Sequence, residues 1–257
     1  SILEYCIIEY ANNGIFIRDI SLLIKDNIIR NMYTDKPHFT PIMCYGNSNN
    51  NDDFLYILNN DIYNCESKGS GGMKIRYYNT VFIINNNIYN NIAIASGGRI
   101  LLHAHQALIK KNYISNNRTD SNGGGISISA HQSVIKNNYI INNYARYNGG
   151  GLVTYEDKHI IEYNYIYNNT SKNGGGLSHS GKDLIIKYNN IGNNKANFGG
   201  FLYINEYHTK ADILLNYNVL KFNDASTGST IYNFREEQIN AIYNYWNTTD
   251  KAKIDEK

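Results

Sequence analysis

Pairs of adjacent glycines recur along this chain at a nearly constant interval. The complete pairs begin at Gly71, Gly97, Gly123, Gly149, Gly174 and Gly199. Successive pairs are therefore 26, 26, 26, 25 and 25 residues apart. A second signature, N-x-[IL]-x-x-[NC], recurs with the same steps to within a few residues, beginning at Asn60, Asn86, Asn112, Asn138, Asn164, Asn189 and Asn218. Two independent signatures with one period indicate a true repeat, which restricts the fold to stacked units.

Three positions of the repeat are aliphatic in almost every unit. The first column is Ile57, Ile83, Ile109, Ile135, Ile161, Ile186 and Leu215. The second is Ile62, Ile88, Ile114, Ile140, Ile166, Ile191 and Leu220. The third follows the glycine pair and is Ile100, Ile126, Leu152, Leu177, Leu202 and Ile231. The third column breaks at Lys74, where we expect the neighbouring Ile75 to point inward after a local slip.

Three aliphatic stripes in a 26-residue unit fit three short strands separated by Gly and Asn turns. Helical repeats would not tolerate a glycine pair and several asparagines in every unit. Stacked units would form three parallel sheets around an aliphatic interior, so the sequence predicts an all-β, right-handed parallel β-helix. Asn accounts for 43 of the 257 residues. At the turns between sheets its amide can bond to the amides one unit above and below, which predicts an asparagine ladder.

Two segments interrupt the period. Residues 32–53 contain both prolines and an Asn-rich stretch, and we expect a loop that protrudes from one turn. Residues 240–257 hold the only Trp and end in a charged run, which suits a terminal turn or cap. We interpret 1–257 as one β-helix domain and, because it opens without Met, as a fragment of a longer protein.

The composition makes several classes of partner improbable. A net charge of +2, with 24 basic and 22 acidic residues spread along the chain, lacks the footprint of a nucleic-acid-binding protein. No window is apolar enough for a membrane-spanning segment. The three cysteines, Cys6, Cys44 and Cys65, have no metal-ligand spacing, and no cofactor is indicated.

The units NNYIINNYARYNGGGL and NNIGNNKANFGGFL resemble the repeats of polymorphic outer-membrane and adhesin-like β-helix proteins. The Asn and Ile bias and the ending NYWNTTDKAKIDEK are similar to adhesin-like surface proteins of methanogenic archaea. The resemblance covers roughly residues 55–250. It implies the pectate-lyase-like superfold and a place outside the cell or on its surface. It does not choose between adhesion and catalysis, because the same architecture serves both.

The residues that should face outward are the candidates for function. The strand beside the glycine pairs presents small, neutral residues there, without the paired carboxylates of glycoside hydrolases or the Asp cluster of a calcium site. At the next turn, His105 should stack on His131 and then on Asp157 and Lys182, with His103 nearby. Two or three histidines and a carboxylate could bind a metal or act as base and acid on a polysaccharide. Repeat registry also stacks any solvated turn residues, so this column alone does not establish a metal or catalytic site. Glu156 and His159 flank the column.

Other side chains could bind a ligand without catalysis. His103, Tyr155, Phe201 and Tyr203 are candidates for contact with sugar rings. His179 falls on an inward position, where we expect a hydrogen-bonded buried histidine.

Two functions fit these patterns. The favoured one is an extracellular or cell-surface, adhesin-like or structural module that binds a polysaccharide, a cell-surface glycan or a protein without catalysis. The alternative is a polysaccharide lyase or hydrolase that acts near His105, His131 and Asp157.

Overall fold

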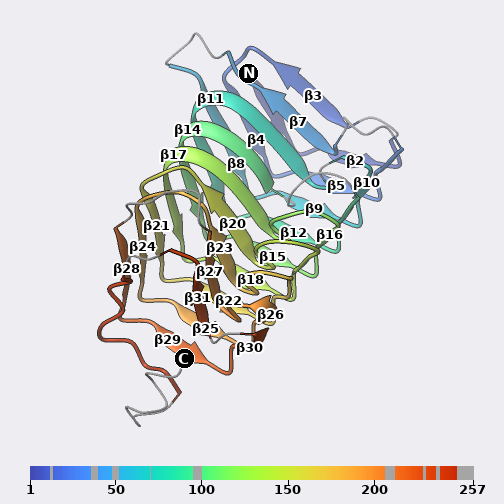
Figure 1. Ribbon diagram of the computed structural model, residues 1–257. Helices are drawn as coiled ribbons and strands as arrows, with labels where there is room; N and C mark the ends of the chain where they lie inside the picture. Colours follow the sequence, from blue (N-terminus) through green and yellow to red (C-terminus); the bar gives the residue numbers. More distant parts are fainter. Residues whose placement is uncertain are drawn as a thin grey trace.

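The computed structural model describes residues 1–11, 14–35, 40–47, 52–69, 71–94, 100–205, 212–227, 230–235 and 238–247. Within these ranges the regular elements are all strands, and the chain coils along a rod with its termini at opposite ends (Figure 1). Each strand pairs in parallel with its counterpart in the next coil, one repeat away. The predicted parallel solenoid with a period near 26 residues is therefore confirmed.

The largest sheet, sheet A, has 15 strands and two arms that meet in three long strands. The long strands are β11 (Met73–Ile84), β14 (Ile100–Lys110) and β17 (Ile126–Lys136). Arm 1 holds their first halves and β3 (Ile15–Arg18), β7 (Ile42–Tyr45), β20 (Leu152–Tyr155), β23 (Leu177–His179), β27 (Leu202–Ile204) and β31 (Ile231–Asn233). Arm 2 holds their second halves and β1 (Ile2–Glu4), β4 (Leu22–Lys25), β8 (Phe54–Leu58), β21 (His159–Glu162), β24 (Leu184–Lys187) and β28 (Ile213–Asn216).

The remaining strands close the other sides of each coil. Sheet B contains β2 (Ile7–Glu9), β5 (Ile28–Arg30), β9 (Asp61–Tyr63), β12 (Asn87–Tyr89), β15 (Tyr113–Ser115), β18 (Tyr139–Ile141), β22 (Tyr165–Tyr167), β25 (Asn190–Gly192) and β29 (Val219–Lys221). Sheet C contains β6 (Tyr33–Thr34), β10 (Glu66–Ser67), β13 (Ile92–Ala93), β16 (Arg118–Thr119) and β19 (Tyr144–Ala145). Strands β26 (Lys195–Phe198) and β30 (Asp224–Thr227) form a separate pair.

The aliphatic columns form the core, as predicted. Ile57, Ile83 and Ile109 of the first column have no exposed surface, nor have Ile62 and Ile88 of the second. The strands bury alternate residues, because successive side chains of a strand point to opposite faces. Sheet C contributes small buried residues, Ser67, Ala93 and Thr119 among them, so the coil has a fourth, narrow side that the three stripes did not predict.

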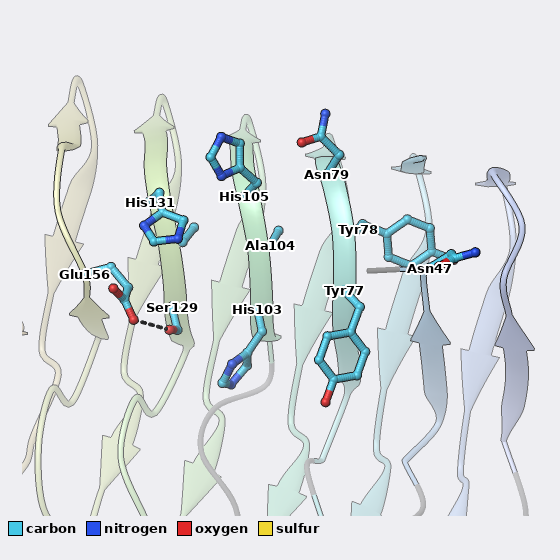
Figure 2. A pocket seen from close by; sticks show the side chains of 11 residues that line it. Asn47, Tyr77, Tyr78, Asn79, His103, Ala104, His105, Ser129, His131 and Glu156 are labelled. Carbon is cyan, nitrogen blue, oxygen red and sulfur yellow. Dashed lines mark hydrogen bonds between the residues drawn. The ribbon is translucent and has the colours of Figure 1, made fainter. Parts of the chain in front are cut away.

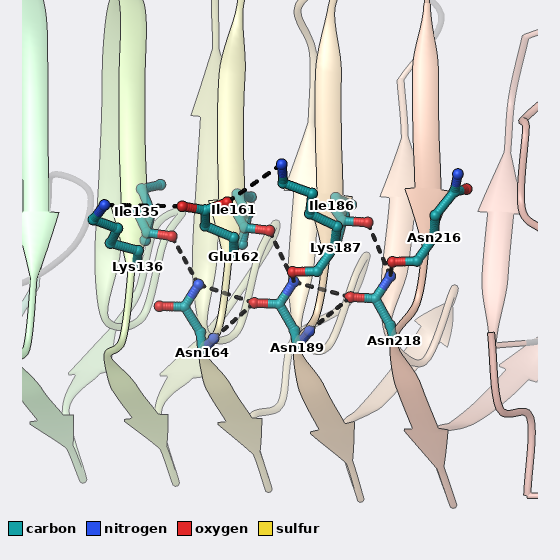
Figure 3. A network of polar contacts seen from close by, with 10 residues as sticks. All are labelled: Ile135, Lys136, Ile161, Glu162, Asn164, Ile186, Lys187, Asn189, Asn216 and Asn218. Carbon is teal, nitrogen blue, oxygen red and sulfur yellow. Dashed lines mark hydrogen bonds and ion pairs between the residues drawn. The ribbon is translucent and has the colours of Figure 1, made fainter. Parts of the chain in front are cut away.

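Two asparagine ladders run along the rod. In the first, Asn164 Nδ2 donates to Asn189 Oδ1 at 3.0 Å, and Asn189 Nδ2 donates to Asn218 Oδ1 at 3.0 Å. Each amide also donates to the carbonyl oxygen of an interior isoleucine of the preceding coil, as Figure 3 shows. The second ladder lies at the turn between sheets B and C and includes Asn91, Asn117 and Asn143. Both ladders are buried, so these asparagines satisfy backbone groups at the turns while exposing almost no surface.

One of two local expectations was wrong. Residues 32–53 are not simply a protruding loop, because their described part supplies β6 and β7, and β7 pairs with both β3 and β11. The expectation at Lys74 was right: Ile75 is fully buried, and the register slips by one residue there, so that Met73 pairs with Ile100.

The C-terminal segment begins a further coil. Asn240 bridges to Leu214, and Tyr245 bridges to Val219. Trp246 packs against the core while remaining partly exposed. The described part of the predicted cap therefore continues the solenoid, and residues 248–257 lie outside the described residues.

Candidate functional site

A polar groove lies on the outer surface of sheet A, where the two arms meet. It has a volume of about 520 Å³ and runs across five successive coils. The residues that line it are Asn47, Tyr77, Tyr78, Asn79, His103, Ala104, His105, Ser129, Ala130, His131 and Glu156. We call this surface the corner groove.

The long strands arrange these residues in two rows. Figure 2 shows Asn79, His105 and His131 side by side on successive strands, with a second row formed by Tyr77, His103, Ser129 and Glu156. The small residues Ala104 and Ala130 lie between the rows, and their registered pairing aligns β14 with β17. The rows follow from repeat registry, because strands that pair without slip place equivalent side chains one above the other.

A β-bulge in β11 places the side chain of Tyr77 on the groove. Arg76 pairs with His103 and Tyr78 with Ala104, so Tyr77 is an extra residue in β11. Its backbone is left-handed, with φ of 66°, and about half of the side chain is exposed. Bulges redirect side chains beside functional sites, and left-handed backbone costs energy for a residue other than glycine. The bulge therefore places an aromatic ring on the groove at some cost in backbone strain.

Aromatic side chains continue from Tyr77 onto the neighbouring coils. The ring centroids of Tyr77 and Tyr45 are 6.1 Å apart, and those of Tyr45 and Phe16 are 6.0 Å apart. Tyr78 has a different role, because it is buried and its hydroxyl donates to the carbonyl oxygen of Ile20 at 3.1 Å. Tyr77 is thus the aromatic side chain that the groove offers to a ligand.

His103 is held in its neutral form. Burial lowers its pKa below the ordinary histidine value, and the positive charges of Arg76 and Lys74 lower it further, while Glu156 opposes them. The pKa of Lys74 is also lowered, by burial and by Arg76. Glu156 is exposed and accepts a hydrogen bond from Ser129 Oγ at 3.3 Å. The groove therefore combines a neutral imidazole, nearby cations and one carboxylate.

The structure brings the predicted histidines together but leaves Asp157 apart from them. The rings of His105 and His131 meet edge to face, with centroids 5.3 Å apart, and both side chains are exposed. Asp157 does not line the groove, and its Oδ1 accepts a hydrogen bond from the backbone N–H of Lys182 at 2.7 Å. No group of three or more His, Cys, Asp or Glu side chains within the described ranges is arranged to hold a metal ion.

The other predicted ligand contacts lie outside the corner groove. Phe201 is not exposed, because its side chain is fully buried in the interior, where the preceding coil has Gly176. Tyr203 is half-buried and stacks on Tyr232, with centroids 5.7 Å apart. Tyr155 is half-buried, and its hydroxyl accepts a hydrogen bond from Asn122 at 3.2 Å. Of the four residues predicted for binding, only His103 lines the groove.

Two further histidines are in the interior. His179 is fully buried, and its Nδ1 lies 2.9 Å from Thr154 Oγ1, as expected for a hydrogen-bonded core histidine. His159 is also fully buried, although the sequence suggested a flanking turn residue. Its Nδ1 lies 2.6 Å from Ser133 Oγ, and its Nε2 lies 2.6 Å from the Tyr155 carbonyl oxygen. Burial lowers the pKa of His159 below the ordinary value.

Sequence reasoning missed Tyr77, Asn79 and Asn47 as groove residues. One signal for Tyr77 was present: the third aliphatic column slips by one residue near Lys74, and the bulge at Tyr77 lies between that slip and the restored register. Asn47 comes from the coil of β7, in the segment where the interrupted period predicts a loop.

Nowhere in the described parts of the chain is there a helix with the length and apolar character needed to cross a bilayer.

Comparison with known proteins supplies the family. A family model described as right handed beta helix region matches residues 1–146, which is more than half of the chain. Nothing among curated proteins or solved structures matches the chain. The parallel coils and the extent of the family match lead to one conclusion: this chain belongs to the right-handed β-helix family.

Proposed function

We propose that this protein is an extracellular or cell-surface module that binds a glycan chain in the corner groove without catalysis. The observation that carries the proposal is the groove itself, which presents Asn, His and Ser side chains in rows beside one aromatic ring. The placement outside the cell rests on the resemblance of the repeats to adhesin-like β-helix proteins.

The chemistry of the groove suits a sugar polymer. Asn79, His105 and Ser129 offer neutral donors and acceptors for hydroxyl groups, and Tyr77 offers an aromatic surface for a sugar ring. The groove crosses five coils, so at about 4.8 Å per coil it is about 19 Å long. An elongated polar groove of that length fits several consecutive units of a linear chain better than it fits a compact small molecule.

The test is binding by the whole chain to a glycan array, followed by calorimetry with the strongest hit. We expect Tyr77→Ala to weaken affinity about five- to tenfold, because an aromatic contact contributes about 1 kcal/mol. Tyr139→Ala is the matched control, since Tyr139 is about as exposed but lies on sheet B. Equal losses in the two variants, or an array without hits, would contradict the proposal.

One observation favours the alternative of a polysaccharide-acting enzyme. A neutral His103 could accept a proton, and the cations Arg76 and Lys74 lie close enough to lower its pKa. Glu156 is the single carboxylate among the described residues that line the groove, whereas hydrolysis of a glycosidic bond uses two. Incubation with uronate polymers distinguishes the two functions. An unsaturated product that disappears in His103→Ala would establish lyase activity, while binding without turnover would support the non-catalytic module.

A further inference from the structure

An unbroken row of apolar side chains lies on the outer face of arm 2. Successive strands place these residues in direct register: Ile2, Leu23, Tyr56, Phe82, Leu108, Val134, Ile160, Ile185 and Leu214. We call this row the apolar stripe. Ile2 is exposed and the other eight are partly exposed, so the stripe is separate from the core, which is on the opposite face of the same strands. Only 42% of the chain is hydrophobic, so nine apolar residues in nine outward positions are not an effect of composition.

The surface along the stripe is hollowed. One cavity of about 390 Å³ follows Phe82, Leu108, Val134 and Ile160, and a second of about 400 Å³ follows Ile160, Ile185 and Leu214. Apolar side chains run along the middle of both cavities, whereas Asn, His and Ser side chains make up most of the corner groove. A contiguous exposed apolar surface rimmed by polar residues marks an interaction site.

We propose that the stripe is a dimer interface at which two copies of this chain pack side by side, with a twofold axis parallel to the rod. With that axis, equivalent coils of the two copies face each other, but their strands run in opposite directions. The residue two positions before a stripe residue in one copy therefore lies opposite the residue two positions after the same stripe residue in the other copy. The rims carry opposite charges in this arrangement. Lys158 and Glu162 flank Ile160, and Asp183 and Lys187 flank Ile185.

Each of these coils would therefore form two ion pairs across the interface. Lys158 of one copy faces Glu162 of the other, and Asp183 faces Lys187. In the two coils before them, the neutral Gln106 and Gln132 would face Lys110 and Lys136. Such a rim steers the encounter and sets the register, while the apolar centre supplies most of the affinity.

The buried area distinguishes the parallel arrangement from an antiparallel one. Nine coils at about 4.8 Å give a stripe about 38 Å long, and five strand residues give a width of about 16 Å. Each copy would bury about 600 Å², and the pair about 1,200 Å², which reaches the lower bound for a specific interface. An antiparallel dimer that preserves the same charge pairing would centre between Ile160 and Ile185 and overlap over fewer than half of the coils.

Sedimentation of the whole chain over a range of concentrations up to about 100 µM tests the proposal. We expect a monomer–dimer equilibrium that Val134→Glu weakens about thirtyfold or more, because the charge would lie at the centre of the apolar surface. The matched control is Tyr139→Glu, which places the same charge on sheet B and should leave the dimer unchanged. A monomer at every concentration, or a dimer that Val134→Glu does not affect, overturns the proposal.

Two further sets of variants test the same dimer and are less open than Val134→Glu to the objection that the variant fails to fold. Lys187→Asp should weaken dimerisation, and adding Asp183→Lys should restore it, because the exchanged charges still face each other. With Cys6 replaced by Ser, Leu23→Cys and Ile185→Cys should each form a disulfide between copies, since a parallel twofold axis brings every stripe residue opposite itself. Cross-linking at only one of these positions, or at neither, contradicts the parallel dimer.

Discussion

At the scale of single residues, asparagine determines whether the coils stay in register. Asn138 donates through Nδ2 to the carbonyl oxygens of Ile109 and Lys136 and to Asn164 Oδ1, at 2.9–3.0 Å. Its own Oδ1 accepts hydrogen bonds from the backbone N–H and the side chain of Asn112. One buried amide therefore satisfies polar groups in three coils, and no aliphatic residue could replace it without leaving those groups unpaired.

We expect Asn138→Ala to lower the free energy of unfolding by about 3 kcal/mol, because it leaves several buried donors and acceptors without partners. Urea denaturation followed by circular dichroism measures the loss. Asn197→Ala is the control, since Asn197 is exposed and should change stability by less than about 0.5 kcal/mol. A loss as small as that of the control would mean that the ladder contributes little to stability.

At the scale of single elements, β11 differs from its neighbours by one inserted residue. β14 and β17 pair without a slip across the corner, whereas β11 is irregular between Arg76 and Tyr78. The insertion directs Tyr77 outward with φ of 66°, a conformation that glycine adopts without strain. The same bulge therefore both exposes the Tyr77 ring and strains the backbone at Tyr77.

Replacing Tyr77 by Gly should separate these two effects. Both Tyr77→Gly and Tyr77→Ala remove the ring, but only glycine relieves the left-handed backbone. We expect the glycine variant to be about 1 kcal/mol more stable than the alanine variant by urea denaturation, while both lose glycan affinity. Equal stability of the two variants would show that the bulge is not strained.

The repeat made most strands and core residues predictable. Most of the groove was not predictable in this way, because part of it depends on a residue that departs from the repeat. The inward columns and the asparagine ladder followed from spacing alone, because each unit repeats the same pattern of burial. The stacking of His105 on His131 was also predictable from registry. The burial of Phe201 was not predictable, since its ring occupies interior space that depends on glycine in the preceding coil. The position of Tyr77 depends on one inserted residue that shifts the register locally.

At the scale of the whole molecule, the rod is a series of coils that each pack mainly on the coils before and after. A disturbance in one coil therefore weakens its neighbours first. The fully buried His159 and His179 meet edge to face, with ring centroids 6.0 Å apart, on successive coils between the two arms of sheet A. Protonation would place a charge in that interior.

Stability should therefore fall in mild acid. His159 is neutral when folded because burial lowers its pKa, an effect that the hydrogen bond to the Tyr155 carbonyl oxygen and the carboxylates of Asp157 and Glu156 oppose only in part. Below about pH 6.5 the unfolded chain binds a proton that the folded chain does not, so stability falls by up to about 1.4 kcal/mol per pH unit.

Urea titrations at pH 7, 6 and 5 measure this slope. His159→Gln should flatten it, because that variant has no buried imidazole to keep neutral at this position. Hydrogen exchange should place the first acid-induced opening in the coils of β21 and β23, and uniform opening along the rod would contradict a local origin.

The first asparagine ladder also governs how a chain of this kind can change in length. Each amide from Asn27 to Asn218 donates to the amide of the following coil, and most receive the equivalent bond from the coil before. Duplication of one coil would insert an amide that makes the same two bonds, and loss of one coil would rejoin the same partners. The cross-section of the rod is therefore compatible with many lengths, so evolution can alter the reach of the molecule by copying or deleting units without redesigning its interior.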